Sequence, residues 1–536
     1  MWTLGLNWIF HDAAACLLDE RGVPVAFGEE ERFRRSKHAV QTAPRLSAAF
    51  CLREAGIAYE ELDTVAVGWD IPRMFPDWYA EHDARQILLE LLGKAYAPGT
   101  EPRLEFVPHH TAHALSTYYA AGATEAAVLV VDGSGETEST SIYTARGGEP
   151  PVRVAEWGIP DSLGGMYEGL SRALGLGRFG AGKAMGLAAY GRGGPTPPVP
   201  LRIDEEDGPH SSLDVPADIS YPEFATVWEG WFRDSLGELP PPHRLDESPE
   251  AIATAWSCQE LVESGMQWLA AQARAAAGTE TLCLAGGVAL NCSANGLLPP
   301  PLYVPPFPHD SGVALGAAWA VTPPPAEVAP ITPYLGLGCS PLDVDVATSA
   351  RPWEPFDAAA VAARLVVGEI GAIVDERAEV GPRALGHRSI IGLPRPAAAR
   401  DRLNERKGRE RWRPLAPIAR AADAPELWED RGPLLRYMIG ATTPTDYGRE
   451  VLPAAVHVDG TARAQVIGEA PVHGARVVEE ILAALPEAGA PPVLINTSFN
   501  GPGEPIVNTA QDAMAAFDRG LGLDFVVVGD RVVTRA

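Results

Sequence analysis

The alternation of strand-like and helix-like segments constrains this chain more than any other feature of its sequence. Residues 128–131 and 282–285 are short, wholly apolar runs of the kind that form buried strands. Residues 251–277 have helical spacing and few helix breakers, so they are predicted to form one long helix. Because this alternation continues along the chain, the sequence predicts an α/β fold.

The length of 536 residues is enough for about two to four domains. The proline-rich stretch 323–333 is predicted to connect two of them, and a second α/β pattern begins at Ala360. We therefore expect the change of domain near residues 340–352, which gives one domain at 1–345 and a second at 346–536.

The composition excludes several classes of function. Hydrophobic residues make up 46% of the chain and charged residues 21%, so global disorder is not expected. A net charge of -27 repels phosphate backbones, which disfavours binding to nucleic acid. The six cysteines show no C-x-x-C spacing, and neither a basic leader nor a membrane-length apolar run is present. We expect a cytoplasmic protein with buried thiols that does not enter membranes.

Three histidines within residues 109–113 form the most informative stretch. Pro108 suits the first turn of a helix on which His109 and His113 would share one face, whereas His110 would point about 100° away. Two imidazoles at this spacing can bind one metal ion. The alternative is one core histidine with satisfied hydrogen bonds, together with surface histidines.

Two histidine ligands leave a metal site incomplete, so carboxylates are expected from elsewhere. Asp132 ends an apolar run and opens a turn with Gly133 and Gly135, where backbone N–H groups could approach phosphate oxygens. Asp310 is the second candidate. A hairpin turn at Asp132 and a loop or capping role for Asp310 are the alternatives. Two histidines and carboxylates with open positions suit Fe(II), although zinc and manganese are chemically compatible.

Residues 286–291 follow a predicted strand and begin a helix. Gly286 and Gly287 would permit close approach of a nucleotide, and the helix N-terminus beyond them favours negative charge. Tight packing of strand against helix is the alternative, because the segment is neither a G-x-G-x-x-G nor a Walker A motif.

A basic group stands out in the C-terminal part of this acidic chain. Arginines recur near glycines at 379–389 and again at 407–413, and guanidinium groups pair bidentately with phosphate oxygens. A salt-bridged helix containing Glu405 and Glu410 is the alternative. Residues 496–501 follow another apolar run, and their hydroxyl and amide groups could hydrogen-bond a small acyl phosphate; a plain turn is the alternative.

Six collinear segments resemble the nodulation and antibiotic O-carbamoyltransferases, which include the tobramycin, novobiocin, cephamycin and ansamycin enzymes. The resemblance covers nearly the whole chain. The segments are residues 10–12, 30–33, 37–38, 109–113, 132–136 and 286–291.

The resemblance implies an N-terminal duplicated actin-like ATPase domain, related to the threonylcarbamoyl-adenosine synthases, and then a YrdC-like α/β domain. It implies a metal ion, expected to be iron, on His109, His113, Asp132 and Asp310. The nucleotide would lie beside Gly133, Gly135, Lys183, Gly286, Gly287 and Asn291, although Lys183 could equally be a solvated loop lysine. Carbamoyl phosphate and ATP, with which Mg²⁺ can bind, would be held in the second domain by Arg383, Arg388, Lys407, Arg413, Arg463, Ser498 and Asn500.

The resemblance also implies the chemistry. Carbamoyl phosphate and ATP would give carbamoyl adenylate, whose carbamoyl group then passes to a hydroxyl of a small-molecule natural product, as in antibiotic tailoring. His11 is our candidate base, because an imidazole titrates near neutral pH, and Asp12 would orient it or contribute to binding. A structural turn histidine is the alternative.

Other functions are disfavoured by specific features. Carbamoylation of a protein cysteine or of tRNA conflicts with the missing C-x-x-C pairs and the acidic charge. A non-catalytic nucleotide-binding sensor would not keep all four candidate ligands, and a sugar kinase would not explain the second domain. Residues 68–79 and 220–243 are rich in aromatics and could contact the acceptor or form core. No nucleic-acid or membrane partner is expected, and a homodimer is left open.

Overall fold

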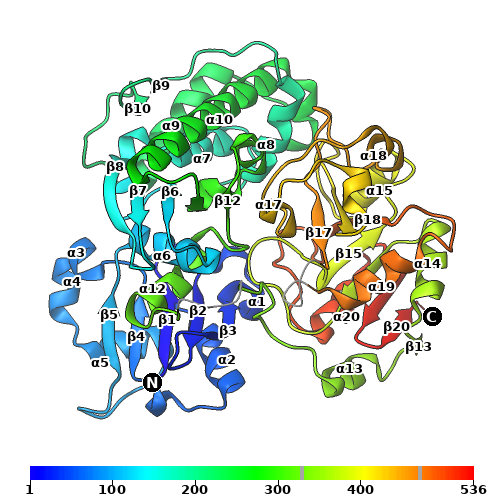
Figure 1. Ribbon diagram of the computed structural model, residues 1–536, viewed down its shortest axis with the longest axis horizontal. Helices are drawn as coiled ribbons and strands as arrows, with labels where there is room; N and C mark the ends of the chain where they lie inside the picture. The colour runs from blue at the N-terminus through cyan, green and yellow to red at the C-terminus, as the bar shows by residue number, and fades with distance from the viewer. Residues whose placement is uncertain (326–330, 469–473, 536) are drawn as a thin grey trace. The chain divides into compact units, whose positions relative to one another are not determined.

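The computed structural model describes residues 1–325, 331–468 and 474–535 (Figure 1). The chain forms two compact units: unit 1 comprises Met1–Arg34 and His38–Ile331, and unit 2 comprises Arg35–Lys37 and Thr332–Ala536. Strands and helices alternate in both units, so the prediction of an α/β fold is confirmed.

Unit 2 begins before the residues at which the sequence predicted the change of domain. Residues 333–339 run beside residues 376–380, where Gly336 N donates to the Ala378 carbonyl and Ala378 N donates to the Leu337 carbonyl. These bonds attach the segment to unit 2 although its composition is that of a linker. Of the predicted proline-rich connection, residues 326–330 lie outside the described residues.

Unit 1 contains two five-stranded sheets that share one strand order, β3-β2-β1-β4-β5 and β8-β7-β6-β11-β12. In each sheet three consecutive strands pair antiparallel, and two later strands then extend the first of them in parallel. The first sheet comprises β1 (Thr3–Asn7), β2 (Ala14–Leu18), β3 (Pro24–Glu29), β4 (Thr64–Val67) and β5 (Arg103–Phe106). The second comprises β6 (Ala126–Val131), β7 (Glu138–Ala145), β8 (Val152–Gly158), β11 (Leu282–Ala285) and β12 (Leu302–Tyr303).

Helices α6 (His109–Ala121) and α12 (Val313–Val321) pack against each other, α6 on the sheet of β6 and β11 and α12 on the sheet of β1 and β4 (Figure 1). A Cβ at Gly316 of α12 would lie 1.7 Å from the carbonyl oxygen of Ala112 on α6, so only glycine permits this close crossing. The crossing brings the start of α6 near the residues that precede α12.

The predicted long helix is confirmed as α10 (Pro249–Ala277). It begins where the Ser248 side chain accepts a hydrogen bond from Ala251 N, and it ends at Gly278 in the left-handed conformation. The other strands and helices of unit 1 are β9 (Leu201–Asp204), β10 (Gly208–Ser211), α1 (Glu30–Arg34), α2 (Arg45–Ala55), α3 (Ile71–Met74), α4 (Pro76–Glu81), α5 (Ala84–Leu92), α7 (Leu163–Ala173), α8 (Ala181–Ala188), α9 (Tyr221–Leu236) and α11 (Cys292–Leu297).

Unit 2 is a three-layer sandwich around an eight-stranded sheet of order β13-β20-β19-β14-β15-β18-β16-β17. Alternate residues of the central strands face opposite layers: Ile373 packs with helices α14 and α19, whereas Ala372 and Val374 pack with α13, α15 and α20. The strands are β13 (Trp353–Pro355), β14 (Gly371–Val374), β15 (Arg388–Gly392), β16 (Ala416–Arg420), β17 (Gln465–Ile467), β18 (Val493–Ser498), β19 (Phe525–Val528) and β20 (Arg531–Thr534). The helices are α13 (Pro341–Thr348), α14 (Ala358–Val366), α15 (Ala399–Arg406), α16 (Ala424–Leu427), α17 (Pro433–Arg436), α18 (Asp446–Val451), α19 (Arg476–Ala484) and α20 (Ala510–Asp518).

All six cysteines are free thiols; Cys339 is partly exposed and the rest are buried. Among the described residues, every helix is too short or too polar to cross a membrane.

Candidate functional site

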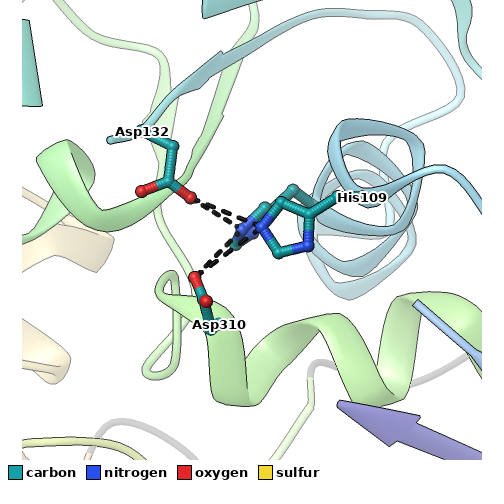
Figure 2. A group of neighbouring side chains, drawn as sticks. His109, Asp132 and Asp310 are labelled. Atoms are coloured by element: carbon teal, nitrogen blue, oxygen red, sulfur yellow. Dashed lines mark ion pairs between the residues drawn. The ribbon is translucent and has the colours of Figure 1, made fainter. Parts of the chain in front are cut away.

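Two histidines and two aspartates from separate segments of unit 1 converge in what we call the His–Asp cluster (Figure 2). His109 and His113 lie one turn apart on α6, Asp132 follows β6, and Asp310 begins the short 3₁₀ turn before α12. Nε2 of His113 lies 3.1 Å from Oδ2 of Asp132 and 3.7 Å from Oδ1 of Asp310. Nε2 of His109 lies 3.7 and 3.8 Å from the same two oxygens. All four side chains are buried, and the four atoms lie within 4.8 Å of one another.

For His109 and Asp132, the atom that faces the cluster is the one left over after the other polar atom of the side chain has formed a hydrogen bond. Nδ1 of His109 lies 3.1 Å from the Gly68 carbonyl oxygen, which places the proton on Nδ1 and leaves the Nε2 lone pair free. Oδ1 of Asp132 accepts hydrogen bonds from Gly133 N at 2.7 Å and Gly287 N at 3.0 Å. Nε2 of both histidines and Oδ2 of Asp132 are buried without a hydrogen-bond partner. Because such atoms are rare, and because imidazole and carboxylate together suit a divalent transition metal, the residues fit a metal site.

Burial couples the charges of the His–Asp cluster. Burial by itself lowers the pKa of His113, but Asp132 and Asp310 together raise it to about 9. Burial by itself raises the pKa of Asp132, whereas His109 and His113 hold it well below its ordinary value. A proton on His113 therefore offsets the carboxylates at neutral pH, and a bound cation would take that proton's place.

The loop after β6 places both an acid and a histidine. Asp132 stands at its start, and near its end Oε1 of Glu136 accepts hydrogen bonds from Asp70 N and His109 N, each at 2.9 Å. His109 is the first residue of α6, so this carboxylate satisfies an N–H group at the helix start and complements the helix dipole. Sequence reasoning did not single out Glu136, because a carboxylate in a turn gives no sign of which helix it caps.

Two of the predicted glycines, Gly286 and Gly287, allow the backbone after β11 to pass close to Asp132. Gly286 has a φ of 93°, and a Cβ there would lie 2.2 Å from the Val131 carbonyl oxygen, so glycine is required directly after β11, where the backbone passes the last residue of β6. A Cβ on Gly287 would lie 2.9 Å from Oδ1 of Asp132. These glycines hold the acid in place, and their contact with a nucleotide stays a prediction.

Gly133 and Gly135 are also close to side chains. A Cβ on Gly133 would meet the Tyr221 hydroxyl oxygen at 2.5 Å, and one on Gly135 would meet Cδ2 of His110 at 2.8 Å. Nδ1 of His110 lies 2.9 Å from Oγ of Ser141, and burial lowers the pKa of His110 to about 3. His110 therefore serves the packing of this loop and lies outside the cluster, as its helical position predicts.

Asn291 is held within the protein. Its Oδ1 accepts a hydrogen bond from Ala294 N at 3.0 Å, and its amide pairs reciprocally with that of Gln259 at 3.1 and 2.9 Å. Lys183 lies in α8, where its side chain is half-buried. A role beside the nucleotide stays a prediction for both residues.

His11 lies in the turn between β1 and β2, next to the His–Asp cluster. Its Nδ1 lies 3.0 Å from Oδ2 of Asp12 and 3.6 Å from Oδ2 of Asp310. Burial by itself lowers the pKa of His11, but Asp310 and Asp12 raise it to about 9. A cation beside Asp310 would offset that carboxylate and bring the pKa back toward neutrality, where an imidazole can accept a proton.

The aromatic residues of the two candidate acceptor segments divide into core and surface. Trp69, Trp228 and Phe232 are buried, and the Trp69 ring stacks on His109 with centroids 3.7 Å apart. Tyr79 is 39% exposed. The buried rings support the fold, which leaves the exposed ones as candidates for contact with an acceptor.

Arg388 supports the fold of unit 2. It opens β15, is fully buried, and uses all five N–H donors of its guanidinium group on backbone carbonyl oxygens at 2.6–3.3 Å. No donor is left for carbamoyl phosphate or ATP, so Arg388 is not among the ligand-binding residues proposed below. The acceptors are the carbonyl oxygens of Leu337, Asp375, Glu376, His387 and Asn508.

Lys407 joins the end of α15 to the turn after β18. Its Nζ contacts the Ser498 carbonyl oxygen and lies 3.0 Å from Oδ1 of Asn500 and 3.3 Å from Oγ of Ser498. The Ser498 hydroxyl donates to Oδ1 of Asn500 at 2.7 Å. These three predicted residues thus form one hydrogen-bonded group. Burial, followed by the positive charges of Arg409 and Arg413, lowers the pKa of Lys407 well below its ordinary value.

Arginines gather beside this group. Burial, followed by the charges of Arg413 and Arg463 and, more weakly, Arg383, lowers the pKa of Arg409 well below its ordinary value, which Glu410 only partly offsets. Nε of Arg409 and of Arg463 is buried without a hydrogen-bond partner. Crowded guanidinium groups with unused donors favour a polyanion. We call Arg383, Lys407, Arg409, Arg413 and Arg463 the basic cluster.

Arg409 is a member that sequence reasoning placed in the basic stretch without assigning it to the site. The relevant signal is its position two residues from Lys407, just after α15, and its Nη1 donates to Oγ1 of Thr497 on β18 at 3.1 Å.

Two family descriptions match the chain. "Carbamoyltransferase N-terminus" matches residues 2–196 and 229–319, and "Carbamoyltransferase C-terminus" matches residues 362–535. The nodulation protein NolNO of Sinorhizobium fredii is 31% identical over 99% of this chain and 80% of its own length. The 3′-hydroxymethylcephem-O-carbamoyltransferase of Amycolatopsis lactamdurans is 32% identical over 54% of this chain and 55% of its own length.

Solved structures are more distant. Full-length HypF in its phosphate- and nucleotide-bound form is 12% identical, with a TM-score of 0.31 over 60% of this chain and 55% of that one. Component A of the (R)-2-hydroxyglutaryl-CoA dehydratase of Acidaminococcus fermentans is 13% identical, with a TM-score of 0.33 over 60% of this chain and 97% of that one. At these scores the likeness bears on neither cluster.

The family assignment rests on the two descriptions and on the relatives. Together the descriptions cover most of unit 1 and nearly all of the sheet of unit 2. The prediction from the motifs is confirmed at this level, and the chain belongs to the carbamoyltransferase family of enzymes.

Proposed function

We propose that this chain is an ATP-dependent O-carbamoyltransferase that acts on a hydroxyl of a small-molecule natural product. The observation that carries the proposal is the 3.6 Å between Nδ1 of His11 and Oδ2 of Asp310, because it puts a candidate base beside a candidate cation site. The relative named 3′-hydroxymethylcephem-O-carbamoyltransferase supports a hydroxyl acceptor.

The first step belongs to unit 2. Water releases phosphate from carbamoyl phosphate and leaves carbamate, whose oxygen attacks the α-phosphorus of ATP. The new O–P bond gives carbamoyl adenylate, and pyrophosphate leaves with the electrons of the bond that breaks. Arg409, Arg413 and Arg463 offset the negative charge that develops on these groups, and Lys407 orients the turn of Ser498 and Asn500.

The second step belongs to unit 1. The acceptor oxygen attacks the carbonyl carbon of carbamoyl adenylate, the bond from that carbon to the phosphate oxygen breaks, and AMP leaves with the bonding electrons. Nε2 of His11 takes the hydroxyl proton, while Asp12 holds Nδ1 so that Nε2 is the unprotonated nitrogen. A divalent cation held by the His–Asp cluster would neutralise phosphate charge and polarise the acyl oxygen.

The organisation follows from the same assignment. We propose an actin-like carbamoyl-transfer domain over residues 1–345 and a YrdC-like adenylate-forming domain over residues 346–536. The shared strand order of the two sheets of unit 1 supports a duplication. Fe(II) is the proposed metal, with Mg²⁺ accompanying ATP.

The proposal is tested by incubating the protein with ATP, carbamoyl phosphate and Fe(II) and following two products separately. Pyrophosphate release reports the first step. Mass spectrometry of an acceptor panel that includes 3′-hydroxymethylcephem, an aminoglycoside and an aminocoumarin reports the second, as a carbamoyl adduct. The expected result is carbamoyl phosphate-dependent release of pyrophosphate and one carbamoylated acceptor. Pyrophosphate release that does not depend on carbamoyl phosphate would contradict the proposal.

His11→Asn separates the steps, because asparagine keeps a donor toward Asp12 and removes the base. We expect it to abolish transfer and to leave pyrophosphate release intact. Loss of pyrophosphate release in this variant would remove His11 from its assigned role.

A further inference from the structure

A second histidine binds the same carboxylate as His11. Oδ2 of Asp12 lies 3.0 Å from Nδ1 of His11, and its Oδ1 lies 3.0 Å from Nδ1 of His38. Burial by itself raises the pKa of Asp12, but the hydrogen bonds from His11 and His38 hold it well below its ordinary value. The carboxylate is therefore ionised and accepts a proton-bearing nitrogen at each oxygen.

The backbone around His38 is shaped to reach Asp12. His38 has a φ of 64° and Asp12 a φ of 51°, left-handed conformations that are strained for a residue other than glycine. Asp12 N donates to the His38 carbonyl at 2.6 Å, and His38 N donates to Oε2 of Glu31 at 2.7 Å. Such backbone strain persists where surrounding contacts impose it, and it gathers at functional sites.

Phe179 covers both imidazoles. Its ring stacks on that of His38, with centroids 3.8 Å apart and planes 19° apart, and meets the edge of His11 at 5.3 Å. The ring comes from the segment between α7 and α8 and is 40% exposed. The two histidines thus contact the same carboxylate and the same partly exposed aromatic ring.

We propose that His38 is a positioning residue for carbamoyl transfer: its Nδ1–H group holds Asp12 in the orientation that directs Nε2 of His11 at the acceptor hydroxyl. The inference rests on the proposed function, in which His11 takes the proton. A carboxylate held at one oxygen can rotate about its Cβ–Cγ bond, whereas one held at both oxygens cannot. A misplacement of about 1 Å in a catalytic group costs about 100-fold in rate.

A second cation is the competing interpretation, because Asp12, Glu31 and His38 also present ligand atoms within 4.8 Å of one another. Two contacts disfavour it. Oε2 of Glu31 is already engaged by the His38 backbone, and its Oε1 lies 3.6 Å from Nε of Arg32, a fixed positive charge. A hydrogen-bonded histidine accounts for the same atoms without added charge.

Two substitutions at one position separate these ideas. His38→Gly removes the ring and tolerates the positive φ without strain. His38→Asn also tolerates that φ, and its side-chain N–H group can stand where Nδ1–H stood. The control is His210→Asn, because Nδ1 of His210 lies 3.8 Å from Oδ1 of Asp161 in another, more exposed histidine–aspartate pair.

The readouts are pyrophosphate release, the metal content, and the rate of methyl carbamate formation with methanol as a minimal hydroxyl acceptor. We expect His38→Gly to lower that rate about 100-fold with an unchanged KM for carbamoyl phosphate, and His38→Asn to recover it to within about tenfold of wild type. Pyrophosphate release should be the same in all three variants, and His210→Asn should match wild type throughout.

Three outcomes would overturn the inference: an active His38→Gly, a His38→Asn as slow as His38→Gly, or two metal ions per chain in the wild type with one lost on substitution. If wild type releases pyrophosphate but carbamoylates neither methanol nor the panel, the proposed function fails instead. Crystal structures of wild type and of His38→Gly then decide the question. If the Asp12 carboxylate and the His11 ring have the same positions in both, His38 does not position them.

Discussion

The two charged clusters of this protein are built in opposite ways. In the His–Asp cluster of unit 1, two carboxylates face two imidazoles, and three of the facing atoms, Nε2 of both histidines and Oδ2 of Asp132, are buried without a hydrogen-bond partner. In the basic cluster of unit 2, positive groups lie side by side. Burial is the largest cause of the lowered pKa of Lys407 and Arg409, and the neighbouring positive charges lower it further. The first arrangement has ligand atoms for a cation, and the second has unused donors for an anion.

The difference shows that burial alone does not identify what a charged residue is for. Arg388 is as buried as any residue of either cluster, yet its five donors all meet carbonyl oxygens. Nε of Arg463 is buried and meets none. Unused hydrogen-bond donors and acceptors therefore distinguish residues that can bind a ligand from residues that stabilise the fold.

The largest effect is expected at the His–Asp cluster. Asp132→Asn keeps an oxygen for Gly133 N and Gly287 N but removes the charge that faces the histidines. We expect loss of the bound metal and a fall in carbamoyl transfer of about 1,000-fold, with pyrophosphate release unchanged. Elemental analysis and product mass spectrometry measure both. If Asp132→Asn binds a full complement of metal and is active, the His–Asp cluster does not bind its cation through the charge of Asp132.

The next effect tests Arg388 as a residue of the fold. Lysine has three donors against five, so Arg388→Lys leaves at least two buried carbonyl groups unpaired and should lower the free energy of unfolding by about 3 kcal/mol. Urea unfolding followed by tryptophan fluorescence measures it, and the exposed Arg402→Lys on α15 is the control. If Arg388→Lys is as stable as wild type but no longer releases pyrophosphate, Arg388 is a ligand-binding residue after all.

Arg463→Met tests whether Arg463 binds a ligand, in contrast to Arg388, which stabilises the fold. Removing one member of a group of like charges should slow pyrophosphate release about 100-fold and leave stability equal to or above that of wild type. Discontinuous assays of pyrophosphate release and thermal unfolding measure the rate and the stability, with Arg400→Met, at a partly exposed position on α15, as the control. A large loss of stability would show that Arg463 supports the fold as Arg388 does.

The smallest effect concerns protons. The pKa of His113 is raised to about 9 from its ordinary value near 6.5, so a proton must leave before a metal binds. Affinity for Fe(II) or Zn²⁺ should rise about tenfold per pH unit between pH 6.5 and 8.5. In the metal-free protein the same proton stabilises the fold fully below pH 6.5, and that contribution is lost as the pH rises through 9. Competition with a chelator at each pH measures the affinity, and an affinity that does not change with pH would argue against a proton on His113 in the metal-free cluster.

Local patterns predicted the parts that depend on one element. The four-residue spacing of His109 and His113 placed them on one face of α6, and the apolar run of residues 282–285 is β11 with the same bounds. The long helix α10 likewise follows from residues 251–277. These features rest on helical or strand periodicity, which a single segment carries in full.

The rest depends on segments that are far apart in the chain. Arg388 sits beside glycines in the sequence, as a phosphate-binding arginine would, and only the approach of carbonyls from residues 337, 375, 376, 387 and 508 reveals its structural role. His38 meets Asp12 across 26 positions of the chain, and both residues adopt a left-handed backbone there. No periodicity encodes such contacts.

The five-residue loop from Asp132 to Glu136 has a consequence for how this enzyme can change. One end supplies Asp132 to the His–Asp cluster, and the other end binds the backbone N–H group of His109, the first residue of α6. The length of the loop therefore sets the distance between Asp132 and His109. Adding or deleting a single residue would move one ligand relative to the other and could not be absorbed by a side-chain rotation. Natural or engineered variants should therefore change the composition of this loop at Ser134 more readily than its length.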